Sequence, residues 1–358
     1  MSQHRKRHCS YHEVAVHLIQ TTTLYSHIPT SYTLRHFLHT LLLLLLLPVS
    51  HGITKAGERI VLCHPTADKG DEVWFHSILT AGRLPEKAVL TIATTGHALI
   101  YVNGRIAMTA AIWPYRPHGI LGMAARDIDI TDFLTIGRNV ISVWYAPCRD
   151  SWSSGQTGQT WAEQTKRGQI AASITTVTEG KETVTCDREQ DWLCTIATGR
   201  ITEYGEDFDA LAYQKDWKEF IYGFSPAWIG TERAEACICD FHDIPDIALH
   251  ACKTYEPLSI VQDKDTTRCY FPPEAEGQIR LTLRKTGKGR LISVNGMRYR
   301  CIGTDDEQFF TRFTTHRTDS LTVTSLDGKP IPEIAGAEII VLKPTDTDKT
   351  KEEQIWKR

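Results

Sequence analysis

Several common signals are missing from this 358-residue sequence, and each absence excludes a class of protein. Helical periodicity is almost absent, because the best amphipathic window, residues 208–220, is short and contains strand formers. A basic excess is also missing: 40 Lys and Arg stand against 43 Asp and Glu, so we expect no nucleic-acid partner. The motifs G-x-S-x-G, G-x-x-x-x-G-K-[ST] and H-E-x-x-H do not occur, so nucleophilic, phosphate-binding and zinc-hydrolase chemistry have no sequence support.

Long hydrophobic runs are limited to one, near the N-terminus. Phe37–Val49 contains seven consecutive leucines, Leu41–Leu47, and its roughly dozen residues suit a signal-peptide h-region but fall short of the ~20 that span a bilayer. The basic cluster Arg5–Arg7 precedes this run, and Ser50–Gly52 offers small residues for cleavage after Gly52. We therefore predict a secreted or periplasmic protein with no membrane span after cleavage; the alternative is a retained anchor.

Cysteine is sparse as well. The ten cysteines are too few for a scaffold that is held together mainly by disulfides. Removal of residues 1–52 would take Cys9 away and leave an odd number, so at least one thiol would stay unpaired or pair between chains. Cys186 and Cys194 form the most local candidate pair, although spacing alone does not give the connectivity.

What the sequence does contain is a phrase that occurs twice. Gly96–Gly104 reads GHALIYVNG and Gly289–Gly296 reads GRLISVNG; each follows an alternating apolar run, Lys87–Thr94 and Gln278–Lys285. Each phrase ends in Asn-Gly, which tolerates the two positive φ angles of a type I′ turn, so each predicts a β-hairpin. A unit repeated at domain-sized spacing indicates two β-sandwich domains with similar plans. Such modules bind or brace more often than they catalyse.

Short strands separated by turn residues continue along the chain. Alternating or continuous apolar runs predict strands at residues 72–79, 88–94, 128–134, 140–145, 169–177 and 183–185. Turns every eight to twelve positions are typical of an all-β sandwich. We predict an all-β fold with two β-sandwich (jelly-roll, galactose-binding-like) domains. The expected divisions are an N-terminal extension and signal peptide at 1–52, sandwiches at 53–240 and 241–345, and a charged tail at 346–358.

The order of several motifs resembles a known family. The hairpin Val102–Gly104, the following Tyr115-Arg116 and the run IDITDFLTIGRNVISV are similar to the N-terminal β-sandwich of bacterial α-L-rhamnosidases, glycoside hydrolase family 78. Gly199–Trp217 and residues 305–325 resemble later segments of that family. The matching positions in the former are Glu206, Phe208, Asp209, Ala210 and Trp217. Leu211 replaces an arginine of the family pattern, so any contact made by that guanidinium is in doubt.

The resemblance spans about residues 70–342 and implies accessory modules without a catalytic barrel. In that family an (α/α)₆ barrel after the sandwiches performs hydrolysis, and an inverting mechanism needs two carboxyl groups roughly 6.5–9.5 Å apart. This chain ends about fifteen residues after the second predicted sandwich. The resemblance therefore implies either a stand-alone accessory protein or a piece of a larger one, and we assign no catalytic residue.

Aromatic residues gather in the loops that follow the first hairpin. An exposed ring offers a sugar an apolar face, and arginine offers a fork of donors to hydroxyl groups. We predict that carbohydrate binding involves Trp113, Tyr115, Arg116, Trp152 and Trp161. Docking on another domain or partner is the alternative for Trp152 and Trp161. Trp144 lies within an alternating strand and is expected in the core.

Four acids occur within seven residues, Glu203, Glu206, Asp207 and Asp209. In a strand, Asp207 and Asp209 share one face, whereas Glu206 and Phe208 share the other. No neighbouring feature in the sequence raises a pKa. We therefore favour a structural or hydrogen-bonding role over catalysis for this group.

Two other clusters are weak candidates for metal sites. Cys237–His242 combines two thiols and an imidazole, but no second C-x-x-C completes four ligands. Asp127, Asp129 and Asp132 alternate with isoleucines, the pattern of a solvated strand face, and calcium needs a denser set of oxygens. We expect no metal and no cofactor.

The favoured hypothesis is an exported accessory module that binds carbohydrate, with a rhamnose-containing polysaccharide as the candidate ligand, or that supports a separately encoded catalytic barrel. Docking of such a partner would leave an exposed apolar patch on the second sandwich. One alternative is an active glycoside hydrolase, an α-L-rhamnosidase, with its acids among Glu203–Asp209. Another is an adhesion module without sugar preference.

Overall fold

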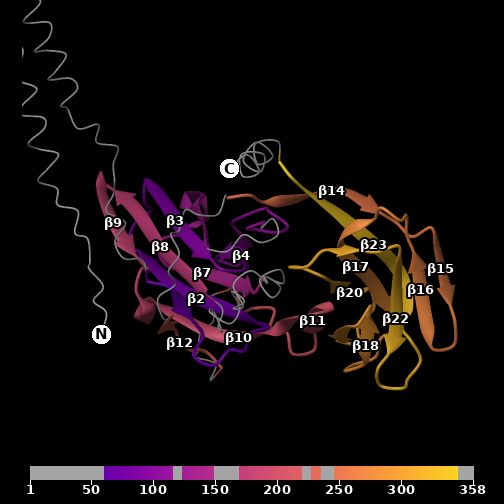
Figure 1. Ribbon diagram of the computed structural model, residues 1–358. Coiled ribbons are helices and arrows are strands. Elements are labelled where there is room, and N and C mark those ends of the chain that lie inside the picture. The colour runs from indigo at the N-terminus through magenta and orange to yellow at the C-terminus, as the bar shows by residue number, and fades with distance from the viewer. Residues whose placement is uncertain (1–59, 116–122, 149–168, 220–226, 235–245, 346–358) are drawn as a thin grey trace, which may run out of the picture. The chain divides into compact units, whose positions relative to one another are not determined.

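The computed structural model describes residues 60–115, 123–148, 169–219, 227–234 and 246–345 (Figure 1). These residues form strands, turns and two single-turn 3₁₀ helices, and no α-helix occurs among them. The predicted all-β fold is therefore confirmed. Within the same ranges, no helix is long and apolar enough to cross a membrane.

The described strands form three sheets. The first sheet runs in the order β13 (Glu232–Arg233), β1 (Leu62–Cys63), β8 (Gln169–Thr178), β3 (Lys87–Thr94) and β6 (Ala124–Asp129), with β9 (Lys181–Thr185) also paired to β8. The third sheet runs in the order β14 (Leu249–Tyr255), β23 (Glu333–Pro344), β17 (Glu276–Arg284) and β20 (Glu307–Phe310), with β21 (His316–Arg317) also paired to β17.

The second sheet, called here the long sheet, has twelve strands. Its order is β15 (Ser259–Gln262), β16 (Thr266–Tyr270), β22 (Ser320–Ser325), β18 (Leu291–Val294), β19 (Met297–Arg300), β11 (Gly205–Asp209), β10 (Trp192–Thr202), β2 (Asp71–Ala81), β7 (Gly137–Ala146), β4 (His97–Val102) and β5 (Arg105–Ile106), with β12 (Ile229–Gly230) paired to β10. β11 and β19 pair in parallel, so the sheet continues from the N-terminal strands into the C-terminal ones.

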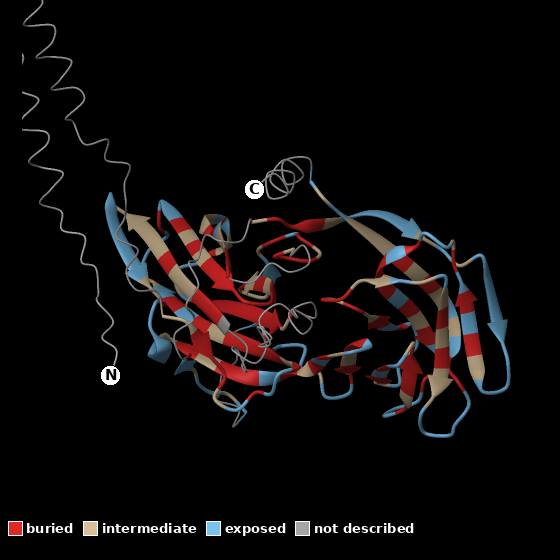
Figure 2. Ribbon diagram, in the orientation of Figure 1, coloured by how far each residue is buried: buried red, intermediate tan, exposed pale blue. Residues whose placement is uncertain are grey.

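Two hydrophobic cores lie against this long sheet (Figure 2). The first core joins the first sheet to β2, β4 and β7, and the second joins the third sheet to β16, β18, β19 and β22. β2 shows how the sequence produces this packing: Val73 and Phe75 alternate into the first core and are fully buried. Each fully buried side chain of this size contributes about 1.5–3 kcal/mol. The strands therefore form two sandwiches that share one sheet.

Both repeated phrases form the hairpins that the sequence predicts. Asn103 and Gly104 have φ angles of 52° and 75° between β4 and β5, and Asn295 and Gly296 have 48° and 94° between β18 and β19. The run before each hairpin, β3 or β17, lies in the sheet opposite its hairpin. In each repeat the chain therefore passes from a strand of one sheet to the opposite sheet of the same sandwich, where it forms the hairpin.

Two local expectations were wrong. The strand predicted at residues 128–134 ends at Asp129, because Thr131 begins a 3₁₀ turn and its hydroxyl accepts a hydrogen bond from the Ala88 N–H (2.9 Å). The candidate pair Cys186 and Cys194 forms no disulfide, and both thiols are free and buried. The two cysteines are near each other in sequence, but the Cys194 thiol points toward the carbonyl of Gly230 (3.8 Å) rather than toward Cys186.

Candidate functional site

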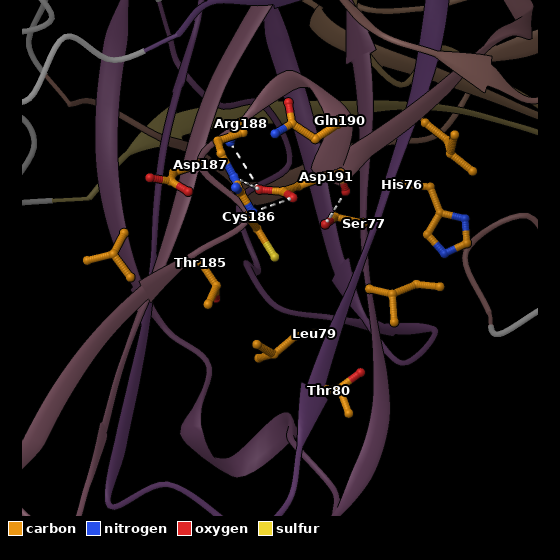
Figure 3. Close-up of a pocket in the computed structure, with 13 residues that line it drawn as sticks. His76, Ser77, Leu79, Thr80, Thr185, Cys186, Asp187, Arg188, Gln190 and Asp191 are labelled. Atoms are coloured by element: carbon orange, nitrogen blue, oxygen red, sulfur yellow. Dashed lines mark hydrogen bonds and ion pairs between the residues drawn. The ribbon is translucent and has the colours of Figure 1, made fainter.

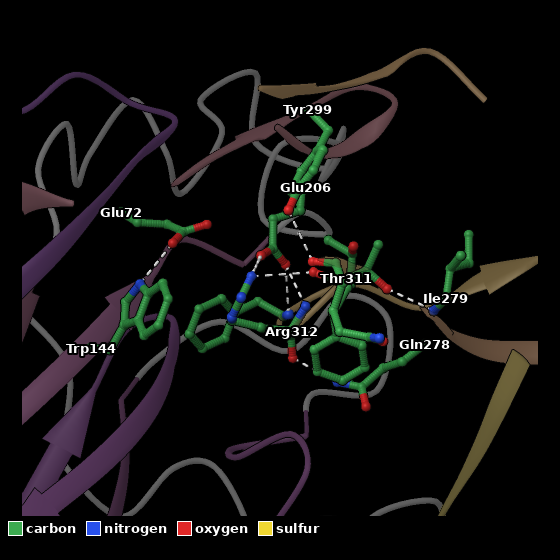
Figure 4. A network of polar contacts seen from close by, with 12 residues as sticks. Glu72, Trp144, Glu206, Gln278, Ile279, Tyr299, Thr311 and Arg312 are labelled. Carbon is green, nitrogen blue, oxygen red and sulfur yellow. Dashed lines mark hydrogen bonds and ion pairs between the residues drawn. The ribbon is translucent and has the colours of Figure 1, made fainter. Parts of the chain in front are cut away.

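The acids predicted from sequence lie where the long sheet passes from one sandwich to the other (Figure 4). Glu206 of β11 is 1% exposed, as expected for the face it shares with Phe208. Its carboxylate accepts hydrogen bonds from the backbone N–H groups of Arg312 (2.6 Å) and Phe313 (2.9 Å), and from the Arg312 guanidinium (3.3 Å). These contacts span 106 residues of sequence and link β11 to the segment that follows β20.

A second buried carboxyl group lies nearby. Glu72 of β2 is fully buried, and its Oε2 accepts a hydrogen bond from Trp144 Nε1 (2.7 Å). Its Oε1 has no hydrogen-bond partner among the described residues. Burial raises the pKa of Glu72 well above its usual range, and the Glu206 charge raises it further, which favours the protonated form. Gly199 leaves room for this group, because a Cβ there would lie 2.2 Å from Oε2.

Burial also raises the pKa of Glu206, although Arg312 and the two backbone donors oppose this by stabilising the carboxylate. No sequence pattern indicated this rise in pKa, because a pattern does not show that the side chain is completely buried. On the other strand face, Asp207 accepts from Arg298 Nε (2.9 Å), and Asp209 lies 3.4 Å from Arg300 Nη1. Glu206, Asp207 and Asp209 are therefore engaged with arginines of the second sandwich.

Aromatic rings surround these polar groups. The Arg312 guanidinium lies over the ring of Phe208, 4.2 Å from its centroid, and 5.1 Å from that of Trp144. Trp74 stacks on Trp217, with ring centroids 4.7 Å apart. We call Glu72, Trp74, Trp144, Glu206, Phe208, Trp217 and Arg312 the junction cluster. Its four aromatic members belong to the second core, and its buried ion pair joins β11 to the segment after β20, so the cluster acts as a structural clamp.

A groove of about 490 Å³ offers a more accessible arrangement. It combines residues from the loop after β5, from β14 and β23, and from the start of β17; they include Tyr115, Lys253, Tyr255, Glu274, Glu276 and Lys343. The backbone N–H of Tyr115 donates to the Ile247 carbonyl (2.8 Å), which fixes that loop beside the strand β14. We call this site the Tyr115 groove.

The chemistry of the Tyr115 groove suits a neutral ligand rich in hydroxyl groups. Its two tyrosines offer apolar ring faces with polar tips. Two lysines and two glutamates supply donors and acceptors without a net charge of either sign. The Lys253 ammonium lies 3.9 Å from the centroid of the Tyr255 ring. This cation–π contact occupies one face of the ring and orients the ammonium group, which is a hydrogen-bond donor.

A second and larger groove, of about 880 Å³, is lined by β2 and by the segment between β9 and β10 (Figure 3). Ser77 Oγ donates to the Asp191 carbonyl (2.7 Å), and Arg188 pairs with the Asp191 carboxylate. Burial raises the pKa of the Cys186 thiol, which keeps it protonated, and lowers the pKa of His76 to about 4, which keeps it neutral. Among its described lining residues there is no Trp, Tyr or Phe, so this groove is less suited to stacking on a sugar.

The structure places only two of the five predicted carbohydrate-binding residues. Tyr115 lines the groove described above. Trp113 is 1% exposed; its Nε1 donates to Asp246 Oδ1 (2.8 Å), and it has no ring face open to a sugar in this conformation. Arg116, Trp152 and Trp161 lie outside the described residues, as does the Cys237–His242 cluster. Trp144 is buried in the core, as predicted.

Sequence reasoning missed most of the Tyr115 groove. Tyr255, Glu274 and Lys343 lie at least 140 residues after Tyr115, and only the sheet order brings them together. One signal was present: Lys253-Thr254-Tyr255, inside the sandwich predicted at 241–345, alternates directly before Glu256-Pro257.

The aspartates considered for calcium have protein partners. Asp127 accepts from Thr91 Oγ1 (2.6 Å), and Asp129 accepts from the Thr131 N–H (3.0 Å). The hydrogen bonds from Thr131 lower the pKa of Asp129. No cluster of three or more metal-ligating side chains occurs in the part of the chain that the structure describes.

Comparison with known proteins agrees with the resemblance seen in the sequence. Residues 84–241 match the family described as the α-L-rhamnosidase N-terminal domain. Three solved rhamnosidases share the fold. The enzyme from Aspergillus terreus is 16% identical with a TM-score of 0.64, that from Dictyoglomus thermophilum is 15% identical with a TM-score of 0.64, and that from Streptomyces avermitilis, solved with L-rhamnose, is 17% identical with a TM-score of 0.60. No curated protein matches the sequence.

The match covers most of this chain but a minor part of each enzyme. It includes 81%, 80% and 77% of this chain, and 36%, 36% and 29% of the three rhamnosidases in the same order. The chain thus spans about a third of the length of these enzymes. The TM-scores of 0.60 to 0.64 establish a common fold, and at identities this low the likeness shows the fold alone.

Proposed function

We propose that this chain is an exported, non-catalytic accessory protein that binds carbohydrate during polysaccharide degradation. The proposal starts from the match of residues 84–241 to the N-terminal domain of α-L-rhamnosidases. A rhamnose-containing polysaccharide is the proposed ligand, and the Tyr115 groove is the proposed site. Export rests on the apolar run Phe37–Val49, and N-terminal sequencing of the protein recovered outside the cell tests cleavage after Gly52.

One observation carries the binding proposal: Tyr115, a sugar-contact candidate from sequence, lines a groove with a second tyrosine and four charged side chains. Sugars bind where ring faces meet their C–H groups and polar side chains meet their hydroxyls. Carboxylates accept from hydroxyl groups and ammonium groups donate to them, so Glu274, Glu276, Lys253 and Lys343 match both hydrogen-bonding roles of a sugar.

The state of the predicted acids supports a non-catalytic role. Glycoside hydrolysis requires an acid and a second carboxylate on opposite sides of the scissile bond. Glu206 is buried in the junction cluster, and Asp207 and Asp209 pair with Arg298 and Arg300. None of these three lines either groove. Hydrolysis of an aryl α-L-rhamnoside tests the alternative of an active hydrolase. The purified protein should release the aryl alcohol no faster than buffer alone does.

Titration calorimetry with rhamnose-containing oligosaccharides tests sugar binding directly. Loss of stacking in Tyr115→Ala or Tyr255→Ala is expected to weaken binding by about tenfold, the effect of roughly 1.4 kcal/mol. Tyr204→Ala is the matched control, because Tyr204 is exposed and does not line the groove. Absence of binding to any glycan would leave the adhesion module as the better hypothesis. Binding that both groove variants retain would place the site elsewhere.

A further inference from the structure

The walls of the Tyr115 groove come from both sandwiches. Among its described lining residues, Tyr115 is the one that the first sandwich contributes, and the others lie on β14, β17, β23 and neighbouring segments. A ring that stacks on a ligand adds most to affinity when it is held in place before the ligand arrives. The affinity of the groove therefore depends on what fixes Tyr115 relative to β14.

Two short segments lie antiparallel beside the groove and carry its two walls. The Leu249 N–H donates to the Ile112 carbonyl (2.9 Å), and the Ala111 N–H donates to the Leu249 carbonyl (2.8 Å). The Tyr115 N–H donates to the Ile247 carbonyl (2.8 Å). The residues that lead into β14 are thus paired with the loop that ends at Tyr115.

A single carboxylate adds side-chain contacts to this pairing. Asp246 directly precedes Ile247, and its Oδ1 accepts hydrogen bonds from Trp113 Nε1 (2.8 Å) and from Arg126 Nε (2.7 Å). Arg126 belongs to β6, and its guanidinium lies 5.6 Å from the centroid of the Trp113 ring. Asp246 therefore ties both the loop and the first sheet to the start of β14.

The contacts on the other side of the loop do not reach β14. The Ala98 N–H of β4 donates to the Trp113 carbonyl (2.8 Å). His97 Nδ1 donates to the Pro114 carbonyl (3.0 Å), because a carbonyl only accepts. These two bonds fix the loop within the first sandwich. Trp113 is 1% exposed, so its indole N–H would be costly to leave unpaired, and Asp246 is the acceptor that links it to the second sandwich.

We propose that Asp246 is the positioning residue of the Tyr115 groove: by holding Trp113 and Arg126, it fixes Tyr115 against β14 so that one ligand contacts both sandwiches. The inference rests on the proposed function only for the nature of that ligand, a saccharide. A ligand that touches both walls favours the paired arrangement of the two segments, so binding and pairing strengthen each other by the same factor.

Hydrogen exchange of the Tyr115 amide tests the positioning without any ligand. In the original protein this N–H is protected by its bond to the Ile247 carbonyl. Asp246→Ala should raise its exchange rate, read by NMR, about tenfold, because local opening becomes easier once the buried contact is lost. Asp246→Asn keeps an oxygen acceptor for Trp113 but removes the charge that pairs with Arg126, so its effect should be smaller.

Asp71→Ala is the matched control for these variants. Asp71 also accepts from an arginine, Arg200 (2.6 Å), but it lines neither groove, so its removal should leave the exchange of Tyr115 unchanged. Thermal unfolding of each variant shows whether the fold is intact, and Asp246→Asn serves in place of Asp246→Ala if the latter does not fold. A Tyr115 exchange rate that neither Asp246 variant raises would overturn the proposal.

A double-mutant cycle separates positioning from a merely structural role. In calorimetry with rhamnose-containing oligosaccharides, Asp246→Ala should weaken binding about threefold to tenfold when Tyr115 is present and no further in a Tyr115→Ala background. Saturating oligosaccharide should also slow the exchange of Tyr115 in Asp246→Ala toward its original rate. Equal losses of affinity in both backgrounds would overturn the positioning role. If the original protein binds no oligosaccharide, the proposed function fails, and the exchange rates alone decide whether Asp246 holds Tyr115.

Discussion

The two hairpins use the same hydrogen bonds with different neighbours. In the first, the Asn103 N–H donates to the Val140 carbonyl (2.8 Å), the Val140 N–H donates to Asn103 Oδ1 (2.8 Å), and Asn103 Nδ2 donates to the Phe133 carbonyl (2.9 Å). In the second, Asn295 makes the equivalent three contacts with Thr322 and Ser320, at 2.9, 2.7 and 3.1 Å. Asparagine thus joins each hairpin to the neighbouring strand as well as forming its turn.

The two sandwiches differ at the residue that precedes Val140 in the first and Thr322 in the second, the residues whose backbones the asparagines contact. In the first sandwich this position is Asn139, which is fully buried, accepts from Asn103 Nδ2 (2.9 Å) and exchanges hydrogen bonds with the backbone of Thr135. In the second it is Leu321, which is fully buried and belongs to the apolar core. The same hairpin backbone therefore accommodates either a polar or an apolar buried side chain at this position. The first sandwich depends on a connected polar network that the second lacks.

The largest effect is expected where the two sandwiches meet. Glu206→Ala removes the acceptor of Arg312 and of two backbone donors, and loss of one partner of a buried ion pair costs about 3–5 kcal/mol. We expect urea denaturation to show a lower free energy of unfolding and two transitions in place of one. Asp207→Ala is the control; it removes a pairing with the exposed Arg298 and should cost under about 1 kcal/mol. A single transition within 1 kcal/mol of the original would contradict the clamp.

Acid should destabilise the first sandwich selectively, through His76. Its folded pKa of about 4 lies below the ordinary value of about 6.5, so the unfolded state binds the proton first. The stability that this provides is complete above pH 6.5 and is lost as the pH falls toward 4, by about 3 kcal/mol. Unfolding free energies from pH 7 to 4 should show this loss in the original protein relative to His76→Gln.

The comparison with His76→Gln is necessary because Glu72 acts in the opposite direction. Its raised pKa provides stability below about 4.5 that is lost as the pH rises, so the two groups partly cancel in the unmodified protein. Subtracting the profile of His76→Gln leaves the contribution of His76. A difference that does not vary with pH would show that His76 titrates normally in the folded state.

The asparagines themselves provide a direct test of the comparison. Asn295→Ala leaves the partly buried Thr322 N–H without its acceptor, which costs about 1–3 kcal/mol, whereas the Ser320 carbonyl keeps the hydrogen bond from the Thr318 hydroxyl (2.6 Å). Asn103→Ala should cost about 1 kcal/mol more, because Asn139 Oδ1 loses a donor as well. Chemical denaturation of the two variants measures this order. Equal losses would mean that the Asn139 network adds nothing to the first hairpin.

The sequence predicts these hairpins well because their determinants are local. Alternation places β3 at Lys87–Thr94, and each Asn-Gly specifies a turn within two residues. The junction cluster has no such signal, because Glu206 and Arg312 lie 106 residues apart and meet only through the shared sheet. The same holds for Tyr115 and Tyr255. Local pattern gives the elements, whereas burial and the partners of each side chain follow from sheet order.

The smallest effect separates backbone strain from contact at the turn glycines. Alanine in the left-handed region costs about 1–2 kcal/mol, so Gly104→Ala and Gly296→Ala should share that loss. A Cβ at Gly296 would lie 2.6 Å from the ring of Tyr204, whereas at Gly104 it would meet the flexible stem of Glu219 at 2.8 Å. Gly296→Ala should therefore cost more.

Truncation of the ring tests the cause of that excess. In a Tyr204→Ala background the loss caused by Gly296→Ala should fall to that of Gly104→Ala, because only the strain common to both turns remains. Tyr204 is exposed, so its own removal should change the free energy of unfolding little. If the loss at Gly296 persists without the ring, the two turns differ in backbone strain, and the likeness of the two hairpins extends only to their hydrogen bonds.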